Sequence, residues 1–144
     1  MSEASRLYTP AILALAVELA DFPLTGKWDA RGSARATQCG STLDLGIELD
    51  ELGRITRIGL NATACAIGQA SAAIFARHAA GRDADDIDNA REGLQAWLDG
   101  DGTEPAWPQL ALLEQARTYP ARHGAIMLGW NAAAHALPFA RVRS

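Results

Sequence analysis

The residues most able to do chemistry in this sequence are its two cysteines, Cys39 and Cys65. Two cysteines do not make a disulfide framework, so each is either a small core residue or a working thiol that serves as a nucleophile or a metal ligand. Cys39 stands in the segment Cys39-Gly40-Ser41, which we expect at the tip between two strands. Cys65 stands near the predicted start of a helix, where the dipole and free backbone amides favour thiolate over thiol.

Around Cys39 the sequence predicts an antiparallel sheet. Apolar residues alternate strictly with other residues from Leu43 to Leu49, which is typical of a strand with one buried face. A weaker strand precedes it, around 34–37, and ends near Cys39. The turn at 50–53, closed by a glycine, leads to a returning strand with Ile55, Ile58 and Leu60. We therefore expect a three-stranded antiparallel meander from about residue 29 to residue 61.

Helices are predicted before and after this meander. The first has Thr9 as its N-cap and Pro10 in its first turn, and it ends before the Pro- and Gly-containing segment 22–26. Four more are predicted over about 63–81, 83–98, 108–116 and 120–137, the last of them ended by Pro138. This order predicts an α+β fold in one domain, residues 1–144, with several helices packed on one face of the sheet.

The composition argues against two classes of partner. The 144 residues carry a formal net charge of −4 and no run of Lys and Arg, so we expect no nucleic-acid binding, and the short basic tail with Arg141 and Arg143 does not change this. The first apolar stretch, residues 11–20, contains Glu18, has no basic segment before it and is too short to span a membrane. A cytoplasmic protein without membrane association is therefore expected.

Three motifs resemble those of the IscU/SufU/NifU-type iron–sulfur cluster assembly family. Cys39-Gly40 before an alternating strand is similar to its first ligand motif, Cys-Gly-Asp. The stretch Ala64-Cys65-Ala66-Ile67-Gly68-Gln69-Ala70-Ser71 is similar to the second, a Gly-Cys-x-Ile-x-x-Ala-Ser segment that opens a helix. Residues 119–122, followed by Leu128 and Trp130, resemble the third, Pro-x-Arg-x-x-Cys-Ala-x-Leu-x-Trp. The likeness runs from about Leu7 to His135, and the long spacer before the third motif resembles the SufU-like branch.

The resemblance implies a ligand set that this sequence completes only in part. Cys39 and Cys65 correspond to two cluster or metal ligands, but Ser41 stands where the family has Asp and Ala125 where it has a third Cys. Neither Ser nor Ala is a normal ligand of iron or zinc. The serious candidate for a replacement is His123, because it lies on the segment that carries the third ligand and imidazole suits both metals.

Other residues fit the gap in the ligand set less well. Asp44 is expected on the opposite face of its strand, whereas His78 and His135 lie far along their helices. Arg122 matches the arginine of the third motif. It either stabilises a nearby thiolate or persulfide, or it is a surface or partner-facing residue.

Three functions are consistent with this pattern. The first is a non-enzymatic assembly protein that binds iron or a labile, transient Fe–S cluster through Cys39 and Cys65. A homodimer could combine the thiols of two chains around one cluster. Zinc is an alternative metal. The second is a SufU-like relay protein that accepts sulfur from a cysteine desulfurase. The third is an adaptor that keeps the fold without the chemistry. The partners implied are a cysteine desulfurase and Fe–S client or carrier proteins.

Overall fold

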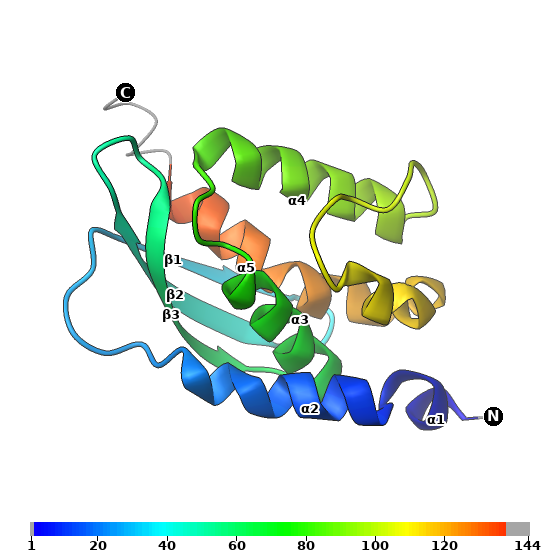
Figure 1. Ribbon diagram of the computed structural model, residues 1–144. Helices are drawn as coiled ribbons and strands as arrows, with labels where there is room; N and C mark the ends of the chain where they lie inside the picture. The colour runs from blue at the N-terminus through cyan, green and yellow to red at the C-terminus, as the bar shows by residue number, and fades with distance from the viewer. Residues whose placement is uncertain (1, 138–144) are drawn as a thin grey trace.

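The structure is a computed structural model that describes residues 2–137 (Figure 1). Five α-helices, three strands and three 3-10 helices follow one another in these residues: α1 (Glu3–Leu7), α2 (Pro10–Glu18), η1 (Leu19–Asp21), β1 (Ala30–Arg35), β2 (Thr42–Leu49), β3 (Ile55–Thr63), α3 (Ala66–Arg77), α4 (Ala84–Leu98), η2 (Leu110–Thr118), η3 (Pro120–Arg122) and α5 (His123–Ala136).

The three strands form one antiparallel sheet in the order β1-β2-β3, as the sequence predicts. The alternating residues Leu43, Leu45 and Ile47 of β2 are buried on its inner face. Helices α3 and α5 pack on that face, while α2 lies against α3 and α4 against α5 (Figure 1). The predicted α+β fold, with helices covering one side of an antiparallel meander, is therefore confirmed.

The other face of the sheet is covered by the segment that joins η1 to β1. The Trp28 ring lies on the paired glycines Gly46 and Gly59, and a side chain at either glycine would collide with the ring. The guanidinium of Arg57 stacks on the outside of the same ring, 3.8 Å from its centroid, and pairs with Glu48. A loop therefore covers one face of the sheet, and helices α3 and α5 cover the other.

Two predicted boundaries next to the cysteines are corrected by the structure. The first strand spans Ala30–Arg35 and stops four residues before Cys39, because the chain needs the residues between Ala36 and Ser41 to turn back. The helix expected from about residue 63 begins at Ala66, since Thr63 still pairs with Thr42 in the sheet. The same helix ends at Arg77, not near Gly81, because Gly81 donates its backbone N–H to the Ile55 carbonyl.

Three further differences lie towards the ends of the chain. Helix α1, which begins at the N-cap Ser2, was not predicted. The short helix expected at 108–116 is the 3-10 helix η2, and it starts later because Gln109 adopts a left-handed conformation with φ of 70°. The last helix is divided into η3 and α5, while its predicted stop at Pro138 lies outside the described residues. Thr9 caps α2 as predicted, with its Oγ1 accepting the Ile12 N–H at 3.2 Å.

The helical layer is held together by a buried cluster of three aromatic rings. Phe75 of α3 stacks on Trp107, and both rings meet Trp130 of α5 edge-on at centroid distances of 5.2 and 5.3 Å. The Trp107 indole N–H also donates to the Ile74 carbonyl at 3.1 Å. The loop before η2 thus fixes α3 against α5. Within residues 2–137, no helix is long and apolar enough to cross a membrane.

Candidate functional site

Cys39 lies on the turn that joins β1 to β2. The turn is closed by two backbone hydrogen bonds of 2.8 Å, from Ala36 N–H to the Ser41 carbonyl and from Gly40 N–H to the Ala36 carbonyl. Gly40 has φ of 72°, a conformation that a side chain would strain. The turn therefore presents the Cys39 thiol at the surface, and this side chain is exposed.

Ser41 is the immediate partner of this thiol. Its side chain is buried, and its Oγ lies 3.0 Å from Cys39 Sγ. The hydrogen bond from Ser41 lowers the pKa of the Cys39 thiol, and the charge of Arg122 adds a smaller effect in the same direction. The residue at the Asp position of the first motif is therefore turned towards the cysteine and favours its thiolate form.

Cys65 is the N-cap residue of α3, whereas the sequence predicted a helix that begins near Thr63 and runs through Cys65. Its backbone is extended, with φ of −65° and ψ of 168°, and its carbonyl accepts the Gln69 N–H at 2.9 Å. Its side chain forms no capping hydrogen bond and is half-buried. The thiol is thus left available beside the free amides of the first helical turn.

The first turn of α5 lies between the two cysteine-bearing segments. A Cβ placed on Gly124 would meet the Ala36 Cβ at 3.1 Å, at the base of the Cys39 turn. Gly68 lies in the first turn of α3, just after Cys65. A Cβ placed on it would meet the Cβ of Ala125 in α5 at 3.2 Å. The three regions that carry the three sequence motifs are therefore packed against one another.

Arg122, at the N-terminal end of α5, contributes its charge to the lowered pKa of the Cys39 thiol. Its Nε donates to Glu3 Oε1 at 3.1 Å. This hydrogen bond, followed by the nearby Tyr8 and Cys65, raises the pKa of the Arg122 guanidinium. The positive charge of Arg122 therefore favours the thiolate form of Cys39.

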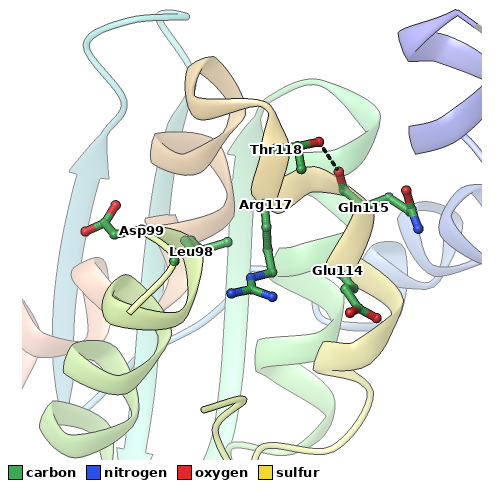
Figure 2. Close-up of a pocket in the computed structure, with 7 residues that line it drawn as sticks. Leu98, Asp99, Glu114, Gln115, Arg117 and Thr118 are labelled. Atoms are coloured by element: carbon green, nitrogen blue, oxygen red, sulfur yellow. Dashed lines mark hydrogen bonds between the residues drawn. The ribbon is translucent and has the colours of Figure 1, made fainter. Parts of the chain in front are cut away.

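His123 is directed elsewhere. Its Nε2 lies 2.9 Å from the Arg117 carbonyl oxygen, and its Nδ1 lies 3.9 Å from Asp99 Oδ1. Arg117 and Asp99 belong to a pocket of about 490 Å³ between the end of α4 and η2, with neither cysteine in its lining (Figure 2). Among residues 2–137, no three His, Cys, Asp or Glu side chains form a group that could hold a metal ion. Within residues 2–137, no third acidic or imidazole side chain therefore completes a ligand set with Cys39 and Cys65.

The remaining candidates have structural partners. Asp44 accepts a hydrogen bond from the Ser33 hydroxyl on the outer side of the sheet. His78 bonds to Gln109 Oε1 at 2.8 Å, and His135 to the Ser33 carbonyl at 2.7 Å. These contacts agree with the expectation that all three lie outside the site.

Sequence reasoning missed Glu3 and Tyr8, which reach Arg122 from the N-terminal segment. The available signal was Ser2 followed by an acidic first turn, which marks the start of α1. It predicts a helix but not what that helix contacts, because the contact joins residues more than a hundred positions apart.

The Ser41 contact predicts how Cys39 reacts. In Cys65→Ser, where Cys39 is the remaining thiol, replacing Ser41 by Ala should slow alkylation by iodoacetamide at pH 7 about threefold, since less thiolate is present. The pH midpoint of the reaction should move upwards, because Ser41 lowers the Cys39 pKa. Stopped-flow or mass-spectrometric rates across pH measure both. Ser33→Ala, an exposed serine of the neighbouring strand, is the matched control; equal rates in both serine variants would contradict the assignment.

Comparison with solved structures found proteins of the same fold. The chain is similar to the N-terminal part of a NifU-like nitrogen-fixing protein from Brucella abortus, with 27% identity, a TM-score of 0.88, and coverage of 99% of this chain and 100% of the other. It also shares the fold of a putative iron–sulfur cluster assembly scaffold protein of the SUF system from Fervidobacterium islandicum AW-1, with 15% identity, a TM-score of 0.80 and coverage of 94% and 98%. No family model matches the sequence, and no curated protein sequence matches it significantly.

Proposed function

The chain has the fold of the IscU/SufU/NifU-type iron–sulfur assembly proteins, and from this premise we propose that it takes part in cluster assembly by binding iron or a labile Fe–S cluster as cargo through Cys39 and Cys65. The observation that carries the proposal is the packing of both cysteine-bearing segments on the first turn of α5, where Gly124 lies against Ala36 and Ala125 lies against Gly68. One thiol comes from a turn of the sheet and the other from a helix start 26 positions later. Both thiols are free, with Cys39 exposed and Cys65 half-buried, so neither is a fully buried core residue.

The donor set of a single chain fits this cargo in part. Thiolates suit iron, zinc and iron–sulfur clusters. A [2Fe–2S] cluster takes four protein ligands, and one chain offers Cys39 and Cys65. A second copy would bring two more cysteines, so a homodimer around one cluster has the required four. A small thiol or a client protein could fill the same positions. Cargo held by so few ligands of one chain exchanges readily, which suits transfer more than storage.

Binding and transfer, not turnover, are the expected activity. The cysteines bind the cargo, Ser41 favours the thiolate form of Cys39, and Arg122 offsets part of the negative charge that thiolates and sulfide bring to the site. Partners would be a cysteine desulfurase as the sulfur source and Fe–S client or carrier proteins as recipients. His123 is the sequence candidate for which the geometry offers least support, because both its ring nitrogens face Arg117 and Asp99.

A second candidate, sulfur relay, is favoured by the exposure of Cys39 and its lowered pKa. The Cys39 thiolate would attack the terminal sulfur of a persulfide on the desulfurase. The donor S–S bond breaks, a new S–S bond forms at Cys39, and the donor cysteine leaves as its thiolate. No external oxidant is consumed. This activity is recognised by a mass gain of one sulfur atom that depends on the desulfurase and its cysteine substrate and not on metal.

Anaerobic reconstitution with ferrous iron, sulfide and a thiol reductant tests the first function. The wild-type protein should develop visible sulfur-to-iron charge-transfer absorption. Cys39→Ser and Cys65→Ser should each lower the bound iron and sulfide at least about tenfold, because the site then has a single thiolate. His123→Gln is the matched control and should keep the absorption. Equal amounts of bound iron and sulfide in the wild type and in both cysteine variants would contradict the proposal. The remaining function would then be that of an adaptor that binds partners without cluster chemistry.

A further inference from the structure

The pocket between the end of α4 and η2 is separate from the cysteine-bearing segments, because neither cysteine lines it (Figure 2). Its volume of about 490 Å³ falls within the range of small-molecule sites in proteins, about 300–1,000 Å³. Three of its lining residues are charged, namely Arg117, Asp99 and Glu114, and the others carry no charge. The pocket therefore combines one cation with two carboxylates.

Arg117 is held in place by one nitrogen and by the flat surface of its guanidinium. Its Nε donates to the Trp97 carbonyl at 2.8 Å, and the guanidinium lies 4.8 Å from the centroid of the Trp97 ring. Among residues 2–137, no hydrogen bond or ion pair engages the two terminal nitrogens of Arg117. The side chain thus offers a fixed fork of N–H donors, which is the geometry that matches a carboxylate.

Asp99 and Glu114 flank this guanidinium without pairing with it. In Figure 2 the Arg117 side chain extends between them, with Asp99 on one side and Glu114 on the other. Asp99 accepts two hydrogen bonds of 3.2 Å from Gln95 Nε2 and lies 3.9 Å from His123 Nδ1. In the described part of the chain, the Glu114 carboxylate has no hydrogen bond or ion pair. Opposite charges therefore line one space and are available to a ligand.

This pattern of charges disfavours simple ions. An inorganic anion bound to Arg117 would be repelled by the two carboxylates, and a metal cation between the carboxylates would be repelled by the guanidinium. A molecule with both a carboxylate and an ammonium group avoids both costs, because each of its charges finds an opposite charge in the lining. Its carboxylate can accept two N–H bonds from the guanidinium, and its ammonium can donate to either acidic side chain.

We propose that the pocket between α4 and η2 binds a small zwitterion, a free α-amino acid or a short peptide, with its carboxylate on Arg117 and its ammonium on Glu114 and Asp99. The two kinds of ligand share this chemistry and differ in the distance between their charges. The inference does not depend on the proposed function, because the pocket contains neither Cys39 nor Cys65. A bound zwitterion would link the end of α4 to η2.

Titration of the isotopically labelled protein with L-alanine and with tri-alanine, followed by amide NMR, tests the proposal. Saturable shifts are expected for residues 98–100 and 114–118 and for the Arg117 Nε–H. The tighter of the two probes identifies the source, amino acid or peptide. Propionate and ethylamine each carry one of the two charges. Each should bind at least about tenfold more weakly, because it lacks one charge-assisted contact.

Glu114→Gln should weaken binding of the tighter probe at least about tenfold, because the ammonium then loses a carboxylate partner. The fold should be unaffected, since Glu114 is exposed. Glu92→Gln, at an exposed position of α4 outside the pocket, is the matched control and should leave the affinity unchanged.

Four results would overturn the proposal. Propionate that binds as tightly as the zwitterions would make the pocket an anion site, and ethylamine that does so would make it a cation site. An equal loss of affinity in Glu114→Gln and Glu92→Gln would show that the charge of Glu114 has no special role. Finally, the absence of saturable shifts with both zwitterions would leave Arg117 only its contact with Trp97 at the end of α4.

Discussion

The double variant Ser41→Asp/Ala125→Cys should bind zinc at least about 100-fold more tightly than the wild-type protein, since two ligands are added to the two present and even groups outside the ligand shell change metal affinity 10–100-fold. Ser41 Oγ already lies 3.0 Å from Cys39 Sγ, so a carboxylate at this position starts beside the first thiol. Position 125 packs against the first turn of α3, next to Cys65. The four groups would then give the closed tetrahedral set that zinc prefers.

Competition with a chromophoric zinc indicator measures this gain. Each single substitution should give an intermediate affinity. The matched control is Thr103→Asp/Ala80→Cys, which adds the same two groups at exposed positions away from the site. An equal gain in zinc affinity in the control would mean that the position of the added groups does not matter. Positions 41 and 125 would then not share a site with the cysteines.

The largest loss of stability should follow from Trp107→Ala. The substitution empties a site that is 3% exposed, ends the contacts with Phe75 and Trp130, and leaves the Ile74 carbonyl without its indole donor. Large-to-small changes of a buried Trp cost about 3–5 kcal/mol. The free energy of unfolding, measured by urea denaturation and far-UV circular dichroism, should fall by this amount, and Tm by about 10 °C.

Trp28→Ala is the comparison for this loss. Trp28 is only partly buried and lies over the outer face of the sheet, so its removal should cost about 1–2 kcal/mol, less than that of Trp107. An equal or larger loss for Trp28→Ala would show that the loop over the outer face, and not the aromatic cluster, holds the fold. Because that cluster joins α3 to α5, Trp107→Ala should also loosen the packing of α3 on α5.

The sheet could be predicted because its signal is local. Alternation in β2 fixes which side chains face the core, and the 50–53 turn fixes the pairing with β3. The ends of elements were less predictable. Thr63 is a good N-cap by type, yet it stays in β3 because it pairs with Thr42, a contact that no window of sequence around Thr63 contains.

In the site, too, local motifs could be predicted and contacts between distant segments could not. Cys39, Cys65 and Arg122 could be selected from motifs, and the segments that carry them pack against one another through Ala36, Gly68 and the first turn of α5. His123 was placed by its sequence distance from Ala125, but the orientation of its ring depends on Arg117 and Asp99, which come from other elements. The hydrogen bond between Ser41 and Cys39 also depends on the turn geometry, and residue type alone indicated only a missing ligand.

Native mass spectrometry of the anaerobically reconstituted protein tests the central claim most directly, because it counts chains, iron and sulfide in one particle. Binding through Cys39 and Cys65 predicts a metal- and sulfide-bearing species, with two chains per [2Fe–2S] cluster when cysteines alone complete the ligands. This species should be absent in Cys39→Ser/Cys65→Ser. The same bound iron and sulfide in that double variant, or none in the wild-type protein, would contradict the account.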